Sequence, residues 1–539
     1  MMMTHWRQHR GILLVCGIVL GAAFGGLQSF SQESSIPKPL PKWKVTISRE
    51  TTFFTKPVGK NGNVNYAEAL NRHYSKGVIP ENNAAVPLFQ AFGTKEIPEK
   101  LRFEFFKKLG IKALPENGVY VTWPDFSKIP NKAERKKAEQ RWHQQYDKAL
   151  EGLWKKAQCP EIANWLDANR KTYSLIMQAS QQPILFVPFV VDGKRQDLST
   201  ALDSRMAVYQ PTRESVRILS MWANLHLGEG HADLAIKDLL AAHRLARLIH
   251  RSGFMIESLV AFALEAIASE GDGRLVASGQ LTAKQTLGYL KQLEQLGPLN
   301  EFGQNYHVAE RCFALDILLQ IAQSEKIDPK DWEGFDLLSK GVVKALSVSF
   351  EDYFDINVVL KEMNHQIDEI VRIANIRDAK SRRKAVRLLK QKLEKFEKDS
   401  KQDPTFLKEG KLKPAERRKA SIWLSRALMT LTLPTLDVCF NAQDRANSRH
   451  DFSKIILALA AYRAEHKNYP AQLTSLTLKY LKVIPLDRFT GEPLKYRRTK
   501  KGFLLYSVGA NGKDDGGRYE YPGESVDDVV IRVPPKSDR

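Results

Sequence analysis

The chain has 539 residues, of which 43% are hydrophobic and 27% are charged. This composition excludes a disordered chain and a polytopic membrane protein, and the length allows about three or four compact units. Four cysteines are too few for a disulfide-stapled scaffold, and their spacing contains no paired zinc-ligand motif. The net charge of +21 favours anionic partners but names none of them.

The N-terminus predicts a membrane segment over residues 1–32. Basic residues, among them Arg7 and Arg10, precede an uncharged stretch over residues 11–32. Its strongly apolar part is short for a spanning helix, which needs ~20 residues, and its Gly/Ala-rich second half supplies the remaining length. Two interpretations remain open, an uncleaved signal anchor and a cleaved signal peptide, and the missing A-x-A pattern favours the anchor. The arginines keep the N-terminus in the cytoplasm, so the body is expected outside it.

Prolines alternate in residues 33–43, which predicts an extended linker that lifts the body off the bilayer. The region over residues 44–130 has a mixed pattern. β-Branched and aromatic residues predict a strand over residues 45–54, and a helix is expected over residues 66–74. This region, including PENNAAVPLFQAF at residues 80–92, resembles the start of a family of uncharacterised, membrane-tethered proteins of planctomycete bacteria. The resemblance implies no activity.

Residues 131–440 follow a helical period and predict a helical body. Its clearest unit, residues 214–250, contains two apolar stripes separated by Gly228-Glu229-Gly230, which predicts two packed helices. The unit resembles one helical hairpin of the tetratricopeptide type, but further copies at a fixed period are missing, so no repeat array is expected. Residues 254–268 continue as a nearly apolar helix.

Two glutamates interrupt this apolar helix and are candidate acid–base residues. Glu257 and Glu265 are eight residues apart, so they lie within a quadrant of one another on a surface built for burial. A buried carboxylate must be paired or have a shifted pKa, and shifted pKa values are one sign of acid–base catalysis. The alternative is a structural ion pair with Arg244, Arg247 or Arg251 of the preceding helix. The first interpretation predicts a hydrolase with an accessible glutamate, and the second predicts a closed arrangement.

His226, Glu229 and His231 (HLGEGH) have the residue types of a zinc-protease helix but not its spacing. That helix needs histidines four residues apart, with the glutamate next to the first histidine. The histidines here are five residues apart and two glycines break the helix between them, so turn formation explains the segment better. The sequence also contains no G-x-S-x-G elbow, phosphate-binding P-loop or dinucleotide-binding motif.

The largest concentration of positive charge lies in residues 371–420, which contain 18 Lys and Arg against 7 Asp and Glu. Within it, residues 380–398 predict a solvated helix with one narrow apolar stripe. One interpretation is docking on acidic membrane lipid or an envelope polymer, and the other is a charged, exposed helix without a partner. Nucleic acid is not expected as a partner, because the body is predicted outside the cytoplasm and the charges are not interleaved with aromatic residues.

Residues 441–539 predict an α+β module. A helix is expected over residues 451–466, two hairpin strands over residues 494–498 and 503–508, and an edge strand over residues 529–533. The motifs AAYRAEHKNYPAQLTSL, YLKVIPLDRFTGEPLKY and LLYSVGANGKDDGG, followed by DDVV, resemble the globular domain of type II secretion major pseudopilins. The resemblance implies a long helix packed on a small antiparallel sheet, with a calcium-binding loop after the hairpin.

The loop after the hairpin has side chains that suit a hard cation. Asn511, Asp514, Asp515, Asp527 and Asp528 cluster in an otherwise basic protein. Calcium takes about six to eight oxygen ligands from such side chains and from backbone carbonyls. Turn formation is the alternative, because Asn-Gly and Asp-Gly-Gly favour turns in any context. Asn511 stands where the resembled family has an aspartate ligand, which predicts weak affinity.

The sequence therefore predicts a mainly α fold, with helix-hairpin packing in the body and a small α+β module at the C-terminus. The expected function is that of a non-enzymatic, membrane-tethered envelope protein that acts as an interaction scaffold, with a calcium-stabilised module. The alternative is an envelope hydrolase that uses Glu257 or Glu265 in a helical pocket.

Overall fold

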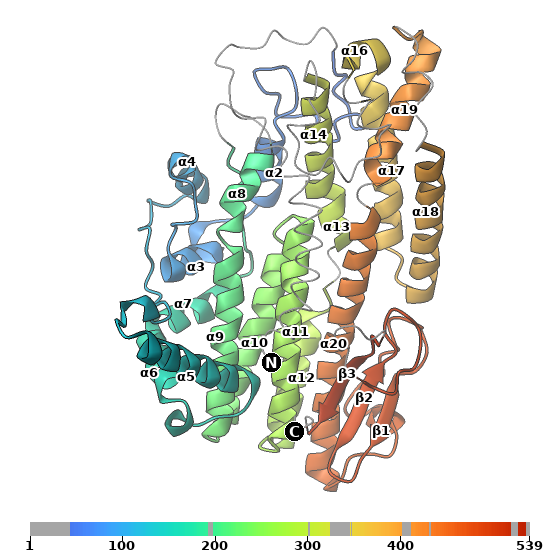
Figure 1. Cartoon of the computed structure of the whole chain (residues 1–539). Coiled ribbons are helices and arrows are strands. Elements are labelled where there is room, and N and C mark those ends of the chain that lie inside the picture. The colour runs from blue at the N-terminus through green and yellow to red at the C-terminus, as the bar shows by residue number, and fades with distance from the viewer. Residues whose placement is uncertain are drawn as a thin grey trace.

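The computed structural model describes residues 44–191, 198–299, 302–323, 345, 348–400, 411–430, 433–518 and 526–534. Helices dominate the described part and one small antiparallel sheet accompanies them, which confirms the predicted fold class (Figure 1). The predicted anchor over residues 1–32 and the predicted linker over residues 33–43 lie outside the described residues. None of the described helices combines the length and the apolarity that crossing a membrane requires.

The N-terminal region begins with a turn, and the predicted strand over residues 45–54 is wrong. Thr52 donates both its hydroxyl and its backbone N–H to the carbonyl oxygen of Ser48, over 2.9 Å in each case. Such local bonds compete with strand pairing, and β-branched composition alone does not reveal them. The predicted helix over residues 66–74 is confirmed as α2 (Tyr66–Tyr74), whose first turn is capped by the side chain of Asn65.

Several smaller helices then cover one flank of the molecule (Figure 1). They are α3 (Ala85–Phe92), α4 (Glu99–Leu109), α5 (Lys132–Glu151), α6 (Pro160–Ala168) and α7 (Arg170–Gln181). Their apolar sides meet the central helices in a core that includes the buried side chains of Trp142, Trp154 and Trp165. Cys159 is buried in the same core, where a thiol packs as a small hydrophobic group.

One short helix and four longer helices, joined by short turns, form the centre of the fold. They are α8 (Ser199–Met206), α9 (Tyr209–Gly228), α10 (Ala232–His250), α11 (Met255–Ala277) and α12 (Ala283–Leu296). The predicted break after Gly228 is confirmed, because α9 ends there and α10 returns along it. α10 also lies against α11 and is buried along most of its length. The apolar helix predicted over residues 254–268 continues to Ala277.

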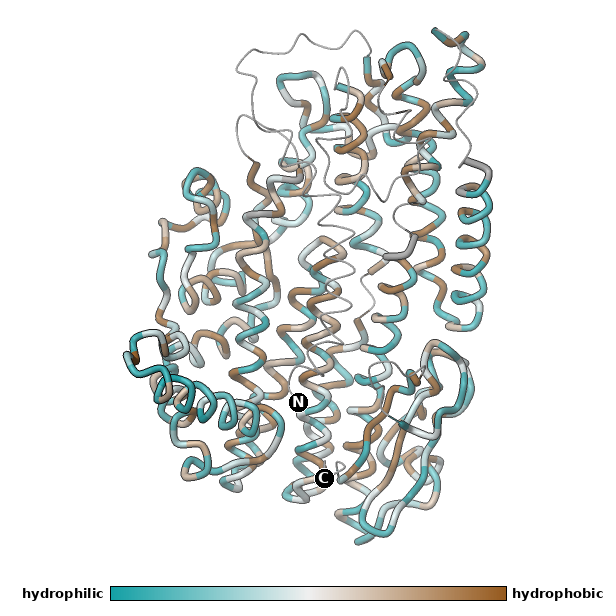
Figure 2. Tube along the Cα trace, viewed as in Figure 1, coloured by the Kyte–Doolittle hydropathy of each residue, from teal (hydrophilic) through white to brown (hydrophobic). Residues whose placement is uncertain are grey.

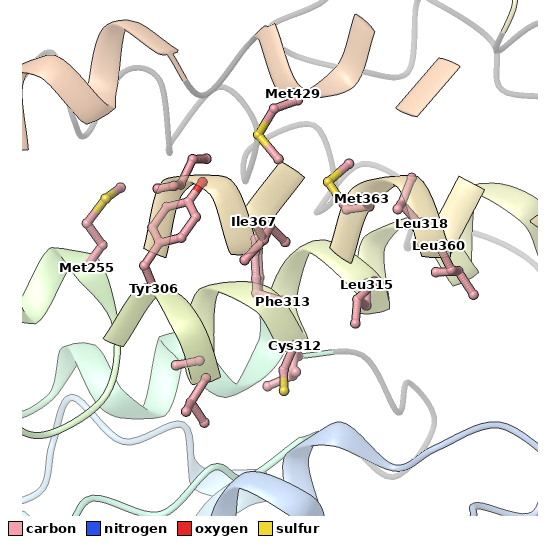
Figure 3. Close-up of a cluster of buried hydrophobic side chains, with 14 of the residues drawn as sticks. Met255, Tyr306, Cys312, Phe313, Leu315, Leu318, Leu360, Met363, Ile367 and Met429 are labelled. Carbon is pink, nitrogen blue, oxygen red and sulfur yellow. The ribbon is translucent and has the colours of Figure 1, made fainter. Parts of the chain in front are cut away.

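A second group of helices packs beside this centre. They are α13 (Phe302–Asn305), the π-helical turn Tyr306–Glu310, α14 (Arg311–Gln323), α16 (Phe350–Tyr353), α17 (Ile356–Ala374), α18 (Ala379–Ser400) and α19 (Pro414–Thr430). Figure 3 shows part of their core, in which Phe313 of α14 points toward Ile367 of α17, whereas Cys312 lies on the opposite side of α14. Figure 2 shows that α18 is largely hydrophilic, whereas the central helices are largely apolar. This group therefore ends in a polar outer helix.

The C-terminal region is built on one long helix. α20 (Leu433–His466) runs through the predicted boundary between residues 440 and 441, and it packs against α11 and α12. Its buried residues, such as Ile455 and Leu459, share a core with apolar residues of α10 and α12. Because the apolar side of α20 faces the central helices, the C-terminal region is continuous with the body.

Three antiparallel strands complete the C-terminal region in the order β1 (Lys495–Arg498), β2 (Phe503–Ser507) and β3 (Val529–Val533). Phe503 pairs with Arg498 on one side and with Val533 on the other. The sheet packs against α20, and β3 also contacts α11. The predicted hairpin, the predicted edge strand and the long helix beside the small sheet are confirmed.

Gly228 allows α9 to approach the chain after α5. A Cβ atom at this position would lie 1.8 Å from the carbonyl oxygen of Trp154, which is backbone and cannot move aside as a side chain can. We expect Gly228→Ala to lower the free energy of unfolding by about 1–3 kcal/mol, because overpacking displaces the backbone.

Gly288→Ala is the matched control for this substitution. Gly288 also lies in a helix, α12, but no described atom lies within 4 Å of its Cβ position. Alanine should therefore raise the free energy of unfolding there by up to about 1 kcal/mol through helix propensity. Chemical denaturation of both variants checks the pair, and a neutral or stabilising Gly228→Ala would contradict the close approach.

Candidate functional site

Six side chains from four helices form a buried ionic cluster in the middle of the fold. They are His243 and Arg247 on α10, Glu265 and Asp272 on α11, Tyr289 on α12 and His450 on α20. All six residues are at most 4% exposed. Because a buried charge is costly unless it is paired and hydrogen-bonded, the contacts inside the cluster decide what it can do.

His243 lies between two carboxylates. Its Nδ1 atom is 2.9 Å from Oε2 of Glu265, and its Nε2 atom is 2.9 Å from Oδ2 of Asp272. Burial alone would lower the pKa of His243, but the two carboxylates outweigh burial and raise the pKa to about 9. The imidazole is therefore protonated at neutral pH and donates both N–H groups. Tyr289 donates its hydroxyl to the other oxygen of Asp272 over 2.6 Å.

Glu265 is the centre of the cluster. Besides His243, its carboxylate accepts a charge-assisted hydrogen bond from Arg247, and Nδ1 of His450 lies 3.2 Å from its Oε1 atom. Burial would raise the pKa of Glu265, but Arg247 and His243 outweigh burial and hold the pKa well below its usual range. Two cations thus face two carboxylates, and the cluster is formally neutral.

His450 connects α20 to this cluster. Nη2 of Arg247 is 3.0 Å from Nδ1 of His450 and 2.9 Å from the carbonyl oxygen of Gly297. Burial, with the charge of Arg247, lowers the pKa of His450 to about 4, so this imidazole is neutral at pH 7. Its Nε2 atom has no hydrogen-bond partner within the described part of the chain. The C-terminal helix therefore contributes a neutral group to the network.

The cluster also contains the group of side chains that most resembles a metal site. These side chains are His243, Glu265 and His450, whose possible ligand atoms all lie within 4.8 Å of one another. A metal ion requires deprotonated ligands with a lone pair directed at it. Both nitrogens of His243 bond to carboxylates, and Arg247 already bonds to Glu265. This donor set fits an ionic network and does not fit a metal ion.

The other predicted glutamate, Glu257, lies in a separate buried pair. Arg205 on α8 donates to its Oε1 atom and also to two backbone carbonyl oxygens. Tyr209 donates its hydroxyl to the same Oε1 atom over 3.1 Å. The Oε2 atom accepts from the backbone N–H of Phe254 over 2.8 Å. Glu257 therefore closes the turn before α11 and fixes α8 against it.

Neither predicted glutamate lies in an open cleft. Both are completely buried and each pairs with an arginine. The pairing of Glu265 with Arg247 is the structural ion pair that the sequence analysis gave as the alternative to catalysis. Glu257 also forms an ion pair, but its partner is Arg205 of α8 and not an arginine of the preceding helix α10. A cavity of about 170 Å³ lies between α17, α18 and α19, and neither glutamate lines it. The hydrolase interpretation requires an accessible glutamate without an arginine partner, and neither Glu257 nor Glu265 has these properties.

The HLGEGH segment forms the end of α9. Nδ1 of His226 is 2.7 Å from Oδ2 of Asp238, whose other oxygen accepts from the hydroxyl of Tyr173 over 2.6 Å. The backbone N–H of Glu229 bonds to a carbonyl of the last helical turn, and that of His231 bonds to the carbonyl of His226. The segment thus ends a helix, as the turn interpretation of its glycines predicted.

The five residues of the predicted calcium loop lie beside the sheet, and each forms contacts that close turns. Asp527 accepts from two backbone N–H groups, that of Asn511 among them, and pairs with an arginine of α20. Asp514 and Asp528 each accept from the N–H of a nearby glycine. The side chain of Asn511 donates to Asp515 over 3.2 Å. In the described ranges, no three of these carboxylates bring ligand atoms within 4.8 Å of one another.

The described part of the basic segment over residues 371–420 comprises the end of α17, α18 and the start of α19. Leu389 is buried, which confirms that the predicted apolar stripe of α18 faces the core. Arg382 and Arg383 both pair with Asp444 of α20, so these two cations hold α18 against the C-terminal helix. Most other Lys and Arg side chains of α18 are exposed.

Sequence reasoning missed four of the six residues of the ionic cluster, His243, Asp272, Tyr289 and His450. His243 and Asp272 are polar residues among mostly buried apolar residues of their helices, which is the signal that pointed to Glu257 and Glu265, whereas His450 lies among other buried polar residues of α20, such as Asn447 and Asp451. Asp272 is seven residues after Glu265, so a helix places both carboxylates on one side. That spacing could have predicted a shared cation, whereas the contribution of α20 depends on tertiary packing.

No family model, curated protein or solved structure matches the chain. The resemblances to pseudopilins and to planctomycete membrane-tethered proteins therefore stay predictions. Function is inferred from the residues of this chain and their geometry.

Proposed function

We propose that the chain is a non-enzymatic, membrane-tethered protein of the cell envelope, and that its helical body is an interaction scaffold. The observation that carries this proposal is the closed ionic cluster around Glu265. The ionisable side chains that acid–base chemistry would need are used to hold four helices together. A scaffold needs surfaces that keep fixed positions relative to one another, and a buried network of paired charges contributes to such rigidity.

Further contacts extend this rigidity toward the surface. Arg382 and Arg383 tie the outer helix α18 to Asp444 of α20. The next residue of α20, Arg445, pairs with Asp527 in the loop that precedes β3. The outer helix, the long C-terminal helix and the sheet are therefore joined by charged contacts as well as by their apolar cores.

The membrane tether is supported by the sequence of the N-terminus. Arg7 and Arg10 precede the uncharged stretch over residues 11–32, and residues 33–43 contain the alternating prolines of an extended linker. A segment with this charge asymmetry keeps its basic end in the cytoplasm and places the rest of the chain on the other side of the membrane.

Cell fractionation with protease accessibility tests this proposal. We expect the native chain in the membrane fraction, with the body degraded when protease is added from outside the cytoplasmic membrane. A cytoplasmic protein treated in the same way is the control for leakage. Recovery of the chain from the cytosol, with its first methionine intact and no association with lipid, would overturn the membrane tether.

We further propose that the C-terminal loop binds calcium weakly. The first supporting observation is that Oδ1 of Asp527 and Oδ1 of Asp528 are buried without a hydrogen-bond partner in the described ranges. The second is the pKa of Asp528. Burial raises the pKa of Asp528, and the nearby charges of Asp515 and Asp514 add to this effect. A cation beside these oxygens would relieve both the missing contacts and the repulsion.

The calcium proposal predicts a calcium-dependent melting temperature. A ligand that binds only the folded state raises stability with its concentration, so the full chain should melt at a higher temperature in calcium than in chelator. Asp528→Asn should abolish the difference, whereas Asp125→Asn, which alters an exposed aspartate of the N-terminal region, should preserve it. Identical melting temperatures of the unaltered chain in calcium and in chelator would contradict calcium binding.

A further inference from the structure

The described chain enters the body at the beginning of α17. The backbone N–H of Thr46 donates to Oδ1 of Asn357 over 2.7 Å, and Nδ2 of Asn357 donates to the carbonyl oxygen of Lys44 over 3.1 Å. Asn364, two turns further along α17, bonds to the carbonyl oxygens of Glu50 and Thr51. The point from which the predicted linker leaves the body is therefore fixed.

The beginning of α19 lies at the same end of the molecule. The backbone N–H of Leu412 donates to the carbonyl oxygen of Asp352 over 3.1 Å, and Arg417 donates to that of Glu351 over 3.2 Å. The N–H of Asp355, the residue that caps α17, donates to the hydroxyl of Ser421 over 2.8 Å. Figure 1 shows α16 and the start of α19 at one end of the molecule and the sheet at the other.

This surface, the tether end, comprises Lys44–Arg49 and Lys411–Lys419. Its exposed cations outnumber its acidic side chains. The exposed cations are Lys44, Arg49, Lys411, Lys413, Arg418 and Lys419. The acidic side chains beside them are Glu50, which pairs with Lys361, Asp352, which is 3.8 Å from Lys411, Glu416, which accepts from the backbone N–H of Lys413, and the half-buried Glu351 and Asp355. The tether end is therefore net positive.

Linker length decides which basic surface meets a bilayer. The eleven residues 33–43 span at most about 40 Å when fully extended, so they hold the residues that come after them near the membrane. α18 is also basic, but its first turn lies at the far end of α17, and the helix then runs back beside α17, where Lys392 pairs with Glu369. The C-terminal sheet lies at the opposite end (Figure 1).

We propose that the tether end docks on an anionic bilayer surface. The inference rests on the proposed membrane tether and names the partner of the last part of the basic segment over residues 371–420, Lys411–Lys419. Lysines and arginines near an anionic leaflet are attracted to its headgroups, and the attraction is screened by salt. Docking at this end holds the C-terminal module away from the lipid, where it is available to other partners (Figure 1).

Energy transfer to headgroup-labelled lipid tests this orientation. A fluorophore is attached to the full chain at Ala415→Cys on the tether end, at Gln391→Cys on α18, or at Ala471→Cys after α20, which are three exposed positions. The chain is then reconstituted in vesicles of phosphatidylcholine alone or of phosphatidylcholine and phosphatidylglycerol in equal parts. We expect the highest transfer from Ala415→Cys, an increase with phosphatidylglycerol, and a decrease with added salt.

Charge removal provides the matched comparison. In one variant, Lys411, Lys413, Arg418 and Lys419 are changed to glutamine. The affinity of the tether end for anionic vesicles should fall about fivefold per cation removed, and therefore several hundredfold when all four are removed. The control changes Lys384, Arg387, Lys390 and Lys395 of α18 to glutamine, which removes the same charge, and should leave the transfer from Ala415→Cys unchanged. Higher transfer from Gln391→Cys than from Ala415→Cys, or equal effects of the two variants, would overturn the docking face.

Flotation with vesicles tests the membrane tether, and the dependence of energy transfer on phosphatidylglycerol tests the docking face, so the two can fail separately. A chain that floats with phosphatidylcholine vesicles but shows no dependence on phosphatidylglycerol keeps its tether and loses the docking face. A chain that does not float with phosphatidylcholine vesicles loses the tether. The transfer measurement on phosphatidylglycerol vesicles still decides the docking face in that case.

Discussion

Glu265→Gln should lower the free energy of unfolding by about 3–5 kcal/mol, because removing one partner of a buried ion pair leaves the other charge uncompensated. Glutamine preserves the volume of the side chain but removes the charge that faces both Arg247 and His243. Chemical denaturation of the full chain, followed by the loss of helical signal, measures the change. We expect the transition midpoint to move to lower denaturant with an unchanged slope.

Glu465→Gln is the matched control for this prediction. Glu465 also pairs with a cation, Lys479, but this pair is exposed to solvent. Exposed pairs contribute little to stability, so the midpoint should stay within the error of the measurement. If the two glutamate variants had equal effects, Glu265 would not hold a buried charge cluster.

A double substitution separates charge balance from packing. Changing Arg247 to Met together with Glu265 to Leu removes one cation and one anion, and it leaves the pair between His243 and Asp272 balanced. Replacing both partners of a buried pair by apolar groups is much less costly than removing one of them. The double variant should therefore be more stable than Glu265→Gln. A double effect equal to the sum of the two single effects would show that the pair is not coupled.

The sequence predicts the parts of this fold that depend on local pattern. The helical period of α10 and α11, the glycine break after α9 and the alternation of the strands were recoverable, because each element is specified by its own residues. The strand expected over residues 45–54 failed because hydroxyl groups of Thr51 and Thr52 bond to the local backbone. Composition does not distinguish a pleated strand from such a turn.

The predicted site was recoverable only in part, for a related reason. An apolar helix with an isolated carboxylate predicts a buried charge, which was correct for Glu257 and Glu265. The partners of such a charge come from elements brought together by the fold, such as Arg205 on α8 and His450 on α20. The continuity of α20 across residues 440 and 441 has the same origin, because the helix is stabilised by the central helices that it covers.

The stability of the chain should decrease as the pH rises from 7 to 9. The carboxylates of Glu265 and Asp272 raise the pKa of His243 to about 9. Because the pKa is higher in the folded state than in the unfolded chain, the stabilisation is complete below about pH 6.5 and is lost as the pH rises through about 9. A shift of this size corresponds to roughly 3 kcal/mol.

The other three groups of the cluster whose pKa values are shifted, Tyr289, Glu265 and His450, do not titrate in this interval. The pKa of Tyr289 is raised well above its usual value, because its ring is buried and its hydroxyl faces Asp272, and the pKa of Glu265 is held low. Burial, with the charge of Arg247, lowers the pKa of His450 to about 4, so protonation of His450 reduces stability only on the acid side of pH 6.5. Within the cluster, the interval above pH 7 therefore reports on His243. Outside the cluster, burial raises the pKa of Glu310 to about 7, so this carboxyl also titrates at the lower edge of the interval.

His243→Gln tests this assignment. The variant should be less stable than the unaltered chain at pH 7, and its free energy of unfolding should change less between pH 7 and pH 9. Thiols and the N-terminal amine titrate equally in both proteins, so the difference between the two curves reports on residue 243. Parallel curves over this interval would show that the imidazole is not protonated between Glu265 and Asp272, and the cluster would then carry a net negative charge in the interior.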